Sequence, residues 1–183
     1  MIVDAQGAQD RVRVATALLQ AAADHGVTLA IAESLTGGQV SSTLVGVPGA
    51  SRVLLGAVVA YATRIKAQVL GVDAAHLERT GPVDRDVVLQ MARGVRRLLG
   101  ADLGLATTGV AGPGPADGHP AGTVHIAVVA PWGEVHRELR LGGDRSQIRC
   151  GTVLNVIELA VGLLSKEADD VNLVAPQYLQ TAD

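Results

Sequence analysis

The first segment of this chain that could do chemistry is residues 32–38, AESLTGG, which follows a short apolar run. Ser34 is a hydroxyl nucleophile at the end of that run, and ligands of open α/β sheets bind where the strands end. The free N–H groups of a helix beginning near Thr36 could hold an oxyanion or a phosphate, and Gly37 and Gly38 would allow a close approach. The same letters are typical of an ordinary helix cap followed by flexible glycines, so both interpretations stay open.

A tyrosine and a lysine form the second candidate, in residues 61–66 (YATRIK). Tyr61 stands at the end of an apolar run, and Lys66 lies one helical turn into the segment that follows, so both could face one cleft. A lysine acts as a base only where desolvation or a neighbouring cation lowers its pKa. The alternative is a lysine that faces solvent and a tyrosine that closes the edge of the core.

Two glycine-rich segments further along could bind a phosphate or a ribose. In residues 107–114 (TTGVAGPG) the candidate contacts are Thr108, Gly109, Gly112 and Gly114. Residues 142–149 (GGDRSQIR) place Arg145 and Arg149 four positions apart, on one helix face, where both could meet a phosphate. The alternatives are an irregular excursion of the chain and two exposed arginines in a first helical turn.

Apolar periodicity and turn signals predict the elements that must position these residues. The predicted strands span residues 27–32, 52–61, 103–107, 124–130 and 135–141. The predicted helices span residues 12–23, 36–45, 63–70, 84–99 and 144–166. This order predicts an α/β fold, a three-layer α/β/α sandwich with a mixed, mostly parallel sheet and one antiparallel hairpin. We expect a single domain with its globular part at about residues 10–166 and a loosely held polar tail after it.

The composition argues against several classes of function. With 183 residues, 48% of them apolar and 18% charged, the chain is a folded globular domain. The aromatic residues are Trp132, Tyr61 and Tyr178, too few for the stacking platforms of single-stranded nucleic-acid binding. The formal net charge is −3, and one short basic run at residues 93–97 is typical of a solvated helix face. We therefore expect no nucleic-acid partner.

Location and cofactors follow from what the sequence lacks. Cys150 is the single cysteine, which fits a reducing compartment. No signal-peptide pattern and no uninterrupted apolar segment of bilayer length is found, so we expect a soluble cytoplasmic protein without a membrane partner. The histidines show no ligand spacing with Cys150 or with paired carboxylates, and Asp117 with His119 does not make a site. We expect neither a metal nor a cofactor.

Taken together and in order, six segments resemble the C-terminal domain of the CinA competence/damage-inducible family, which also occurs alone as the nicotinamide-nucleotide amidohydrolase PncC. They are AESLTGG (32–38), PGAS (48–51), GAVVAYATRIKAQVLGV (56–72), TGVAGPGP (108–115), GTVHIA (122–127) and GGDRSQIR (142–149). The resemblance covers roughly residues 10–165. Six segments in register are far more specific than any one of them.

The resemblance implies the same sandwich and the hydrolysis of nicotinamide mononucleotide to nicotinate mononucleotide and ammonia. Carried over by motif, Ser34 is the nucleophile, Lys66 is its base and Tyr61 stands beside it. The backbone of residues 36–38 could then supply the oxyanion site. The expected substrate contacts are Glu33, Thr36, Gly37, Gly38, Thr108, Gly109, Gly112, Gly114, Arg145 and Arg149. We expect this small-molecule nucleotide as the partner, and a homo-oligomer as the assembly.

Two departures from the family pattern leave alternatives open. Many relatives read G-A-V-S where residues 81–84 read G-P-V-D, so Asp84 keeps a helix cap but would bring a negative charge near the cleft if that loop lines it. Longer members carry an N-terminal nucleotide-processing domain, and 183 residues leave no room for it, so we expect no pyrophosphatase activity. The alternative functions are a non-catalytic nucleotide-binding or interaction module in competence or DNA-damage responses, and an amidase for another nucleotide or a free amide.

Overall fold

The computed structural model describes residues 5–165, which form one five-stranded sheet and its helices. The helices are α1 (Ala5–Asp24), α2 (Gln39–Val45), the 3₁₀ helix η1 (Ala50–Arg52), α3 (Thr63–Leu70), α4 (Ala74–Thr80), α5 (Arg85–Leu99) and α6 (Arg145–Ser165). The strands are β1 (Leu29–Glu33), β2 (Leu54–Val59), β3 (Leu103–Gly109), β4 (Thr123–Ala130) and β5 (Gly133–Arg140). The tail predicted after residue 166 lies outside the described residues.

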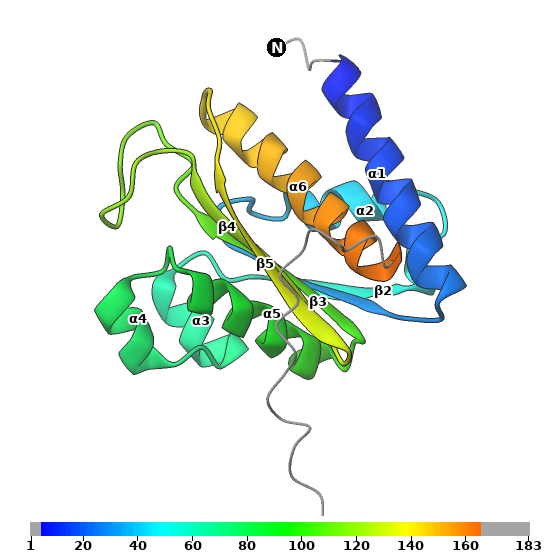
Figure 1. Ribbon diagram of the computed structural model, residues 1–183, viewed down its shortest axis with the longest axis horizontal. Helices are drawn as coiled ribbons and strands as arrows, with labels where there is room; N and C mark the ends of the chain where they lie inside the picture. Colours follow the sequence, from blue (N-terminus) through cyan, green and yellow to red (C-terminus); the bar gives the residue numbers. More distant parts are fainter. Residues whose placement is uncertain (1–4, 166–183) are drawn as a thin grey trace, which may run out of the picture.

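The sheet lies between two layers of helices (Figure 1). Helices α1, α2 and α6 cover one face, and α3, α4 and α5 lie on the other. The strand order is β2-β1-β3-β4-β5, with β1 parallel to both of its neighbours. Strand β4 is antiparallel to β3 and to β5, so it alone opposes the other four strands. The predicted three-layer α/β sandwich with a mixed, mostly parallel sheet is confirmed, and β3–β4 adds an antiparallel pair to the predicted hairpin.

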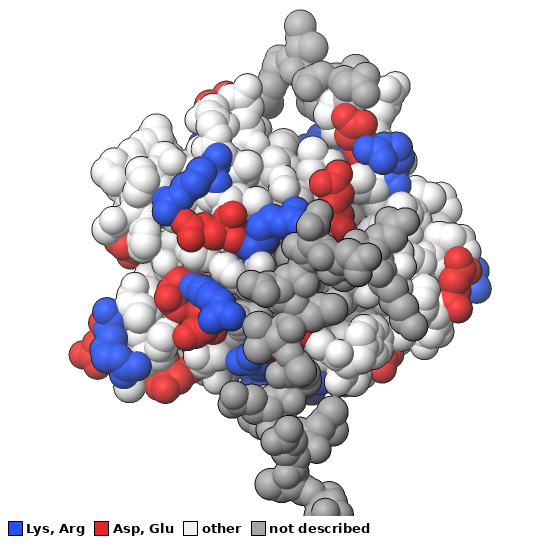
Figure 2. All heavy atoms as spheres, in the orientation of Figure 1, with Lys and Arg blue, Asp and Glu red and all other residues white. Residues whose placement is uncertain are grey.

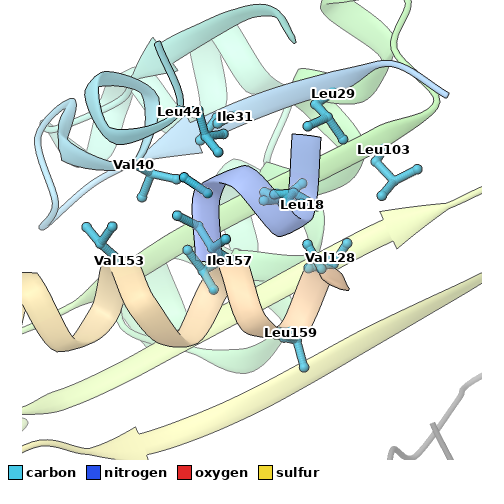
Figure 3. Packing of buried hydrophobic residues seen from close by; sticks show 14 of the residues in the cluster. Leu18, Leu29, Ile31, Val40, Leu44, Leu103, Val128, Val153, Ile157 and Leu159 are labelled. Carbon is cyan, nitrogen blue, oxygen red and sulfur yellow. The ribbon is translucent and has the colours of Figure 1, made fainter. Parts of the chain in front are cut away.

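The two faces of the sheet carry side chains of different size. Large side chains of β1 and β3 point toward α1 and α6, as Figure 3 shows for Leu29, Ile31 and Leu103. Leu105 belongs to the same core. The alternate positions on the same strands are small, namely Ala30, Ala32, Gly104 and Ala106. Since successive strand residues point to opposite faces, the small residues let α5 approach the sheet backbone closely.

Two glycines set how closely α5 approaches its neighbours. A Cβ atom on Gly104 of β3 would lie 2.1 Å from the carbonyl oxygen of Ala92 on α5. A Cβ atom on Gly94 of α5 would lie 1.9 Å from the carbonyl oxygen of Leu70, where α3 ends. No side chain fits at either place, so α3 packs hard against α5. Lys66 precedes Leu70 by one turn on the same face of α3. The packing of α3 on α5 therefore fixes the backbone from which the Lys66 side chain extends.

The predicted helix signals hold at three places. The carboxylate of Asp84 accepts hydrogen bonds from the N–H groups of Asp86 and Val87 and caps α5. The carboxylate of Asp144 accepts from the N–H of Gln147 at the start of α6. Gly71 ends α3 in the left-handed conformation, with φ of 70°. These local caps were readable because each depends on neighbours in the sequence.

Three helices differ from the prediction. Helix α1 begins at Ala5, seven residues before the predicted start at residue 12. Helix α2 begins at Gln39 rather than near Thr36, because Gly38 stands at its N-cap in a left-handed conformation with φ of 93°. Helix α4 was not predicted, since its seven residues are too short to show apolar periodicity. Asp73 caps it through the N–H groups of Ala75 and His76.

Helix α6 is, by length and composition, long and apolar enough to cross a membrane, although the sequence analysis found no apolar segment of bilayer length. Half of its most apolar stretch is buried inside the protein. It packs against α1 and β4, and Val153 and Ile157 lie within the core (Figure 3). These contacts are typical of a core helix in an α/β sandwich.

Acidic and basic side chains stand side by side on the surface seen in Figure 2.

Candidate active site

One cavity opens where β1, β2 and β3 end. Its volume is about 390 Å³, and Ser34, Tyr61, Lys66 and Thr108 are among the residues that line it. Because these three strands run parallel, their carboxyl ends meet at the same edge of the sheet. The sequence-based prediction that the segments after these strands converge on one cleft is confirmed.

Ser34 and Lys66 are in direct contact inside this cavity. The Nζ atom of Lys66 lies 2.9 Å from the Oγ atom of Ser34, and the two side chains come from residues 32 positions apart. The ammonium also donates to the carbonyl oxygens of Ala60 at 2.8 Å and Tyr61 at 3.5 Å. Lys66 is only 1% exposed. The alternative of a lysine that faces solvent is therefore wrong.

Burial changes the acidity of this lysine. Desolvation disfavours the ammonium and lowers the pKa of Lys66 to about 8, while the negative charge of Asp117 opposes part of that shift. An amine with this pKa is partly neutral near physiological pH and can accept a proton. Its two carbonyl contacts occupy N–H bonds, so the lone pair of the neutral amine is left for the hydroxyl of Ser34.

The loop that carries Ser34 is held by the buried carboxylate of Glu33. One oxygen of Glu33 accepts from the N–H groups of Gly38 at 2.9 Å and Val40 at 3.1 Å, and the other accepts from the N–H and hydroxyl of Ser41. Glu33 is fully buried and does not line the cavity. Its charge fills the positive end of α2, where an anion is favoured.

The expected oxyanion site at residues 36–38 therefore needs correction. The N–H of Gly38 is bound by Glu33, and that of Gly37 donates to the carbonyl oxygen of Ser34 at 3.1 Å. Neither glycine lines the cavity. Both have left-handed φ angles, 58° and 93°, so the turn before α2 requires glycine for its backbone and not for a ligand.

Thr36 and Arg149 also support this loop and do not line the cavity. The hydroxyl of Thr36 lies 2.8 Å from that of Thr107 in the buried interior. The guanidinium of Arg149 donates to the carbonyl oxygens of Leu35 at 3.0 Å and Thr36 at 2.7 Å. We expected Arg149 to join Arg145 at a phosphate. The structure contradicts this, because the guanidinium of Arg149 donates to the backbone of the Ser34 loop.

The long loop between β3 and β4, residues 110–122, forms the opposite wall. Gly109, Gly112 and Gly114 line the cavity, as expected. Gly109 is required for packing as well, since a Cβ atom there would lie 2.5 Å from the carbonyl oxygen of Thr123. Thr108 is 1% exposed, and its hydroxyl donates to the carbonyl oxygen of Pro82 at 2.7 Å.

Arg145 and Tyr61 stand together at the rim of the cavity. Arg145 donates to the carbonyl oxygen of Gly112 at 2.7 Å and lies 3.3 Å from the hydroxyl of Tyr61. Tyr61 is 63% exposed, which excludes the alternative of a tyrosine closing the core. Both side chains remain accessible to a ligand that enters from solvent.

Asp117, which the sequence analysis considered only as a metal ligand beside His119, is a charged residue of the cavity lining. It sits in the turn closed by mutual backbone hydrogen bonds between Ala116 and His119 and has a positive φ of 50°. The letters A-D-G-H between prolines are a turn signal, and an acidic residue at a turn within a glycine-rich loop was the available clue.

Asp84 does not bring its charge into the cavity. Pro82 and Val83 line the cavity. The Asp84 carboxylate instead caps α5 and lies 2.8 Å from Nε2 of His76. Burial alone would raise the pKa of Asp84, but hydrogen bonds from His76 and from the helix N–H groups lower it below the usual value. His76, Asp84 and Asp86 bring potential ligand atoms within 4.8 Å of one another, a grouping that the spacing in the sequence did not reveal.

Comparison with known proteins identifies the family. The family model of the CinA C-terminal domain matches residues 11–164. A CinA-like protein from Frankia casuarinae is 49% identical over 138 residues, covering 75% of this chain and 32% of that protein. A CinA-like protein from Synechococcus is 46% identical over 152 residues, covering 80% of this chain and 36% of that protein. The chain spans about a third of the length of these curated relatives.

Solved structures agree with that match. A crystal structure of a competence/damage-inducible protein from Agrobacterium tumefaciens is 34% identical, with a TM-score of 0.81 over 84% of this chain and 95% of that one. A CinA-superfamily protein from Klebsiella pneumoniae is 29% identical, with a TM-score of 0.82 over 85% of this chain and 98% of that one. With the family model covering most of the chain, this protein belongs to the CinA C-terminal domain family.

Proposed function

We propose that this protein hydrolyses the carboxamide of nicotinamide mononucleotide, giving nicotinate mononucleotide and ammonia. The observation that carries the proposal is the buried contact between Ser34 and Lys66 at 2.9 Å, in a cavity at the ends of three parallel strands. A serine hydroxyl beside a lysine of lowered pKa is an activated nucleophile of the kind that acyl transfer needs. The volume of the cavity, about 390 Å³, lies within the range of small-molecule sites.

Acylation begins with neutral Lys66. Its Nζ accepts the hydroxyl proton of Ser34 as Oγ bonds to the carboxamide carbon, which forms a tetrahedral oxyanion. The resulting ammonium then donates a proton to the nitrogen of the substrate as the carbon–nitrogen bond breaks, and ammonia leaves. An ester between Ser34 and the nicotinoyl group remains, and Lys66 is neutral again.

Deacylation repeats the sequence with water. Lys66 accepts a proton from the water molecule that attacks the ester carbon, and it returns a proton to Oγ of Ser34 as the ester bond breaks. The products are the carboxylic acid and the free enzyme, so one water is consumed for each ammonia released. A single base serves both halves because each half returns its proton.

The oxyanion requires a donor other than Gly37 and Gly38. Leu35 follows the nucleophile and lines the cavity. Its backbone N–H is our candidate, because the residue after a nucleophilic serine supplies this donor in other hydrolases. The hydrogen bonds from Arg149 to the carbonyl oxygens of Leu35 and Thr36 would hold that peptide in place during the reaction.

The decisive measurement is ammonia release from nicotinamide mononucleotide, run beside free nicotinamide. We expect release from the nucleotide, no change on adding a chelator, and loss of nearly all activity in Ser34→Ala. Ser42→Ala is the matched control, since Ser42 is an exposed serine on α2 that does not line the cavity. A Ser34→Ala protein that still releases ammonia near the wild-type rate would show that Ser34 is not the nucleophile.

The rival function is a nucleotide-binding module without catalysis. It predicts that the wild-type protein binds the mononucleotide, in a calorimetric titration, yet releases no ammonia. The lowered pKa of Lys66 favours the enzyme, because a purely structural role gives no reason to bury an amine against a hydroxyl.

A further inference from the structure

Three charged side chains line the cavity, and the proposed mechanism uses only one of them fully. They are Lys66, Asp117 and Arg145. Lys66 is the base, and Arg145 stands at the rim beside Tyr61. Asp117 has no step in the hydrolysis, yet it is the single acidic residue among those that line the cavity. A carboxylate in a ligand cavity favours a ligand with positive charge.

The turn that carries Asp117 is fixed over the cavity. The backbones of Ala116 and His119 hydrogen-bond to each other in both directions, at 3.0 and 2.9 Å. Asp117 lies between them with its backbone in the left-handed region. The turn also approaches the segment before α5, since a Cβ atom on Gly81 would lie 4.0 Å from Cβ of Asp117. The backbone that carries Asp117 is therefore set by the turn, and its exposed side chain lines the cavity from there.

The charge of Asp117 acts toward the catalytic end of the cavity. It raises the pKa of Lys66 against the larger opposite effect of burial. Arg145 is held elsewhere, by the carbonyl oxygen of Gly112 and near the hydroxyl of Tyr61. Asp117 and Arg145 both line the cavity, so a ligand that spans it meets a negative and a positive charge.

We infer that Asp117 is a specificity residue that selects a substrate with a cationic ring, pairing with the pyridinium of nicotinamide mononucleotide while Arg145 meets its phosphate. This inference rests on the proposed function. The carboxamide of this substrate is attached directly to the charged ring, so a carboxamide placed at Ser34 brings the ring cation to the side of Lys66 and Asp117. The dihydropyridine form has the same ribose, phosphate and carboxamide but a neutral ring.

The two ring forms therefore isolate the effect of charge. Binding of the oxidised and the dihydro mononucleotide is measured by calorimetry in the Ser34→Ala background, where neither is consumed. We expect Ser34→Ala to prefer the cationic form, and adding Asp117→Asn to weaken that form by about tenfold while changing the neutral form by less than about twofold. Asp24→Asn is the matched control, since it removes an exposed charge that does not line the cavity.

Each result decides the matter. A tenfold loss confined to the cationic form supports charge selection by Asp117. Equal weakening of both forms means that Asp117 contacts the ribose or the loop instead, and no change in either means that it does not face the ligand; both outcomes overturn the inference. Wild-type protein that binds the mononucleotide without releasing ammonia would refute the proposed function alone, because the binding comparison needs no turnover.

Discussion

The two loops that face each other across the cavity are built in opposite ways. In residues 33–38 the polar side chains other than Ser34 bind the protein itself, because Glu33 holds the start of α2 and Thr36 contacts Thr107. Arg149 adds two hydrogen bonds to the backbone of the same loop. In residues 110–122 Gly112, Gly114 and Asp117 line the cavity instead. Both loops are rich in glycine, yet only the glycines of the second line the cavity, whereas the first presents Ser34 and Leu35 to it.

This difference separates two tasks that the sequence letters cannot tell apart. The first loop fixes the nucleophile before substrate arrives, and such preorganisation favours the chemical step. The second loop, with Arg145, supplies contacts that a bound nucleotide would use. Substitutions in the first loop, residues 33–38, and at Lys66 should therefore lower kcat. Substitutions in the second loop, residues 110–122, and at Arg145 should raise KM.

The largest effect on catalysis beyond Ser34 is expected for Lys66→Met, which keeps the length of the side chain and removes the base. We expect kcat to fall by about 10²-fold or more. In the wild type, kcat should rise with pH and level off above about 8, because Lys66 must lose its proton to accept that of Ser34. Methionine removes this base, so any residual rate should lack the same rise.

Arg64→Met is the matched control for that substitution. Arg64 is an exposed cation on the same helix, hydrogen-bonded to Gln68, and it does not line the cavity. Circular dichroism establishes that Lys66→Met is folded before rates are compared. A folded variant with a wild-type pH profile would exclude Lys66 as the base.

An intermediate effect is expected for Glu33→Gln, which loosens the first loop without touching the cavity. The amide keeps the shape of the side chain but removes the negative charge of the oxygens that accept hydrogen bonds from the N–H groups of Gly38, Val40 and Ser41. We expect the free energy of unfolding to fall by about 2 kcal/mol, as for a buried charge-assisted hydrogen bond. We also expect kcat to fall by about tenfold, at nearly constant KM, because Ser34 is less firmly held.

Urea unfolding and steady-state kinetics test Glu33→Gln, with Glu78→Gln on the exposed side of α4 as control. An increase in KM with unchanged kcat would mean that Glu33 binds substrate after all. That outcome would remove the contrast between the two loops.

The smallest effect is expected for Arg145→Ala, which removes a charge beside the second loop. Arg145 is exposed, so its charge is partly screened, and we expect KM for the mononucleotide to rise by about fivefold with kcat unchanged. The increase should shrink at high salt. Arg137→Ala removes another exposed arginine, on β5, and should leave KM as it is. An unchanged KM in Arg145→Ala would place the phosphate elsewhere.

Much of the fold was predictable from local pattern. The three apolar runs before Ser34, Tyr61 and Thr108 became parallel strands that end at one edge, as their lack of polar alternation indicates. The caps at Asp84 and Asp144 were equally legible, because a cap depends on residues within one turn. Helix α4 was missed because a segment of two turns carries too little apolar periodicity.

The sequence by itself therefore determined the layers, the family resemblance and the pairing of Ser34 with Lys66 as candidates. Tertiary structure alone decided which polar groups are left for a ligand. The sequence predicts Glu33 and Arg149 as substrate contacts, but packing turns their charged groups toward the backbone of the Ser34 loop. The same packing buries Lys66 and lowers its pKa, and it brings Asp117 to the cavity. Hydrogen-bond partners and burial are set by residues far apart in the chain, so no local pattern encodes them.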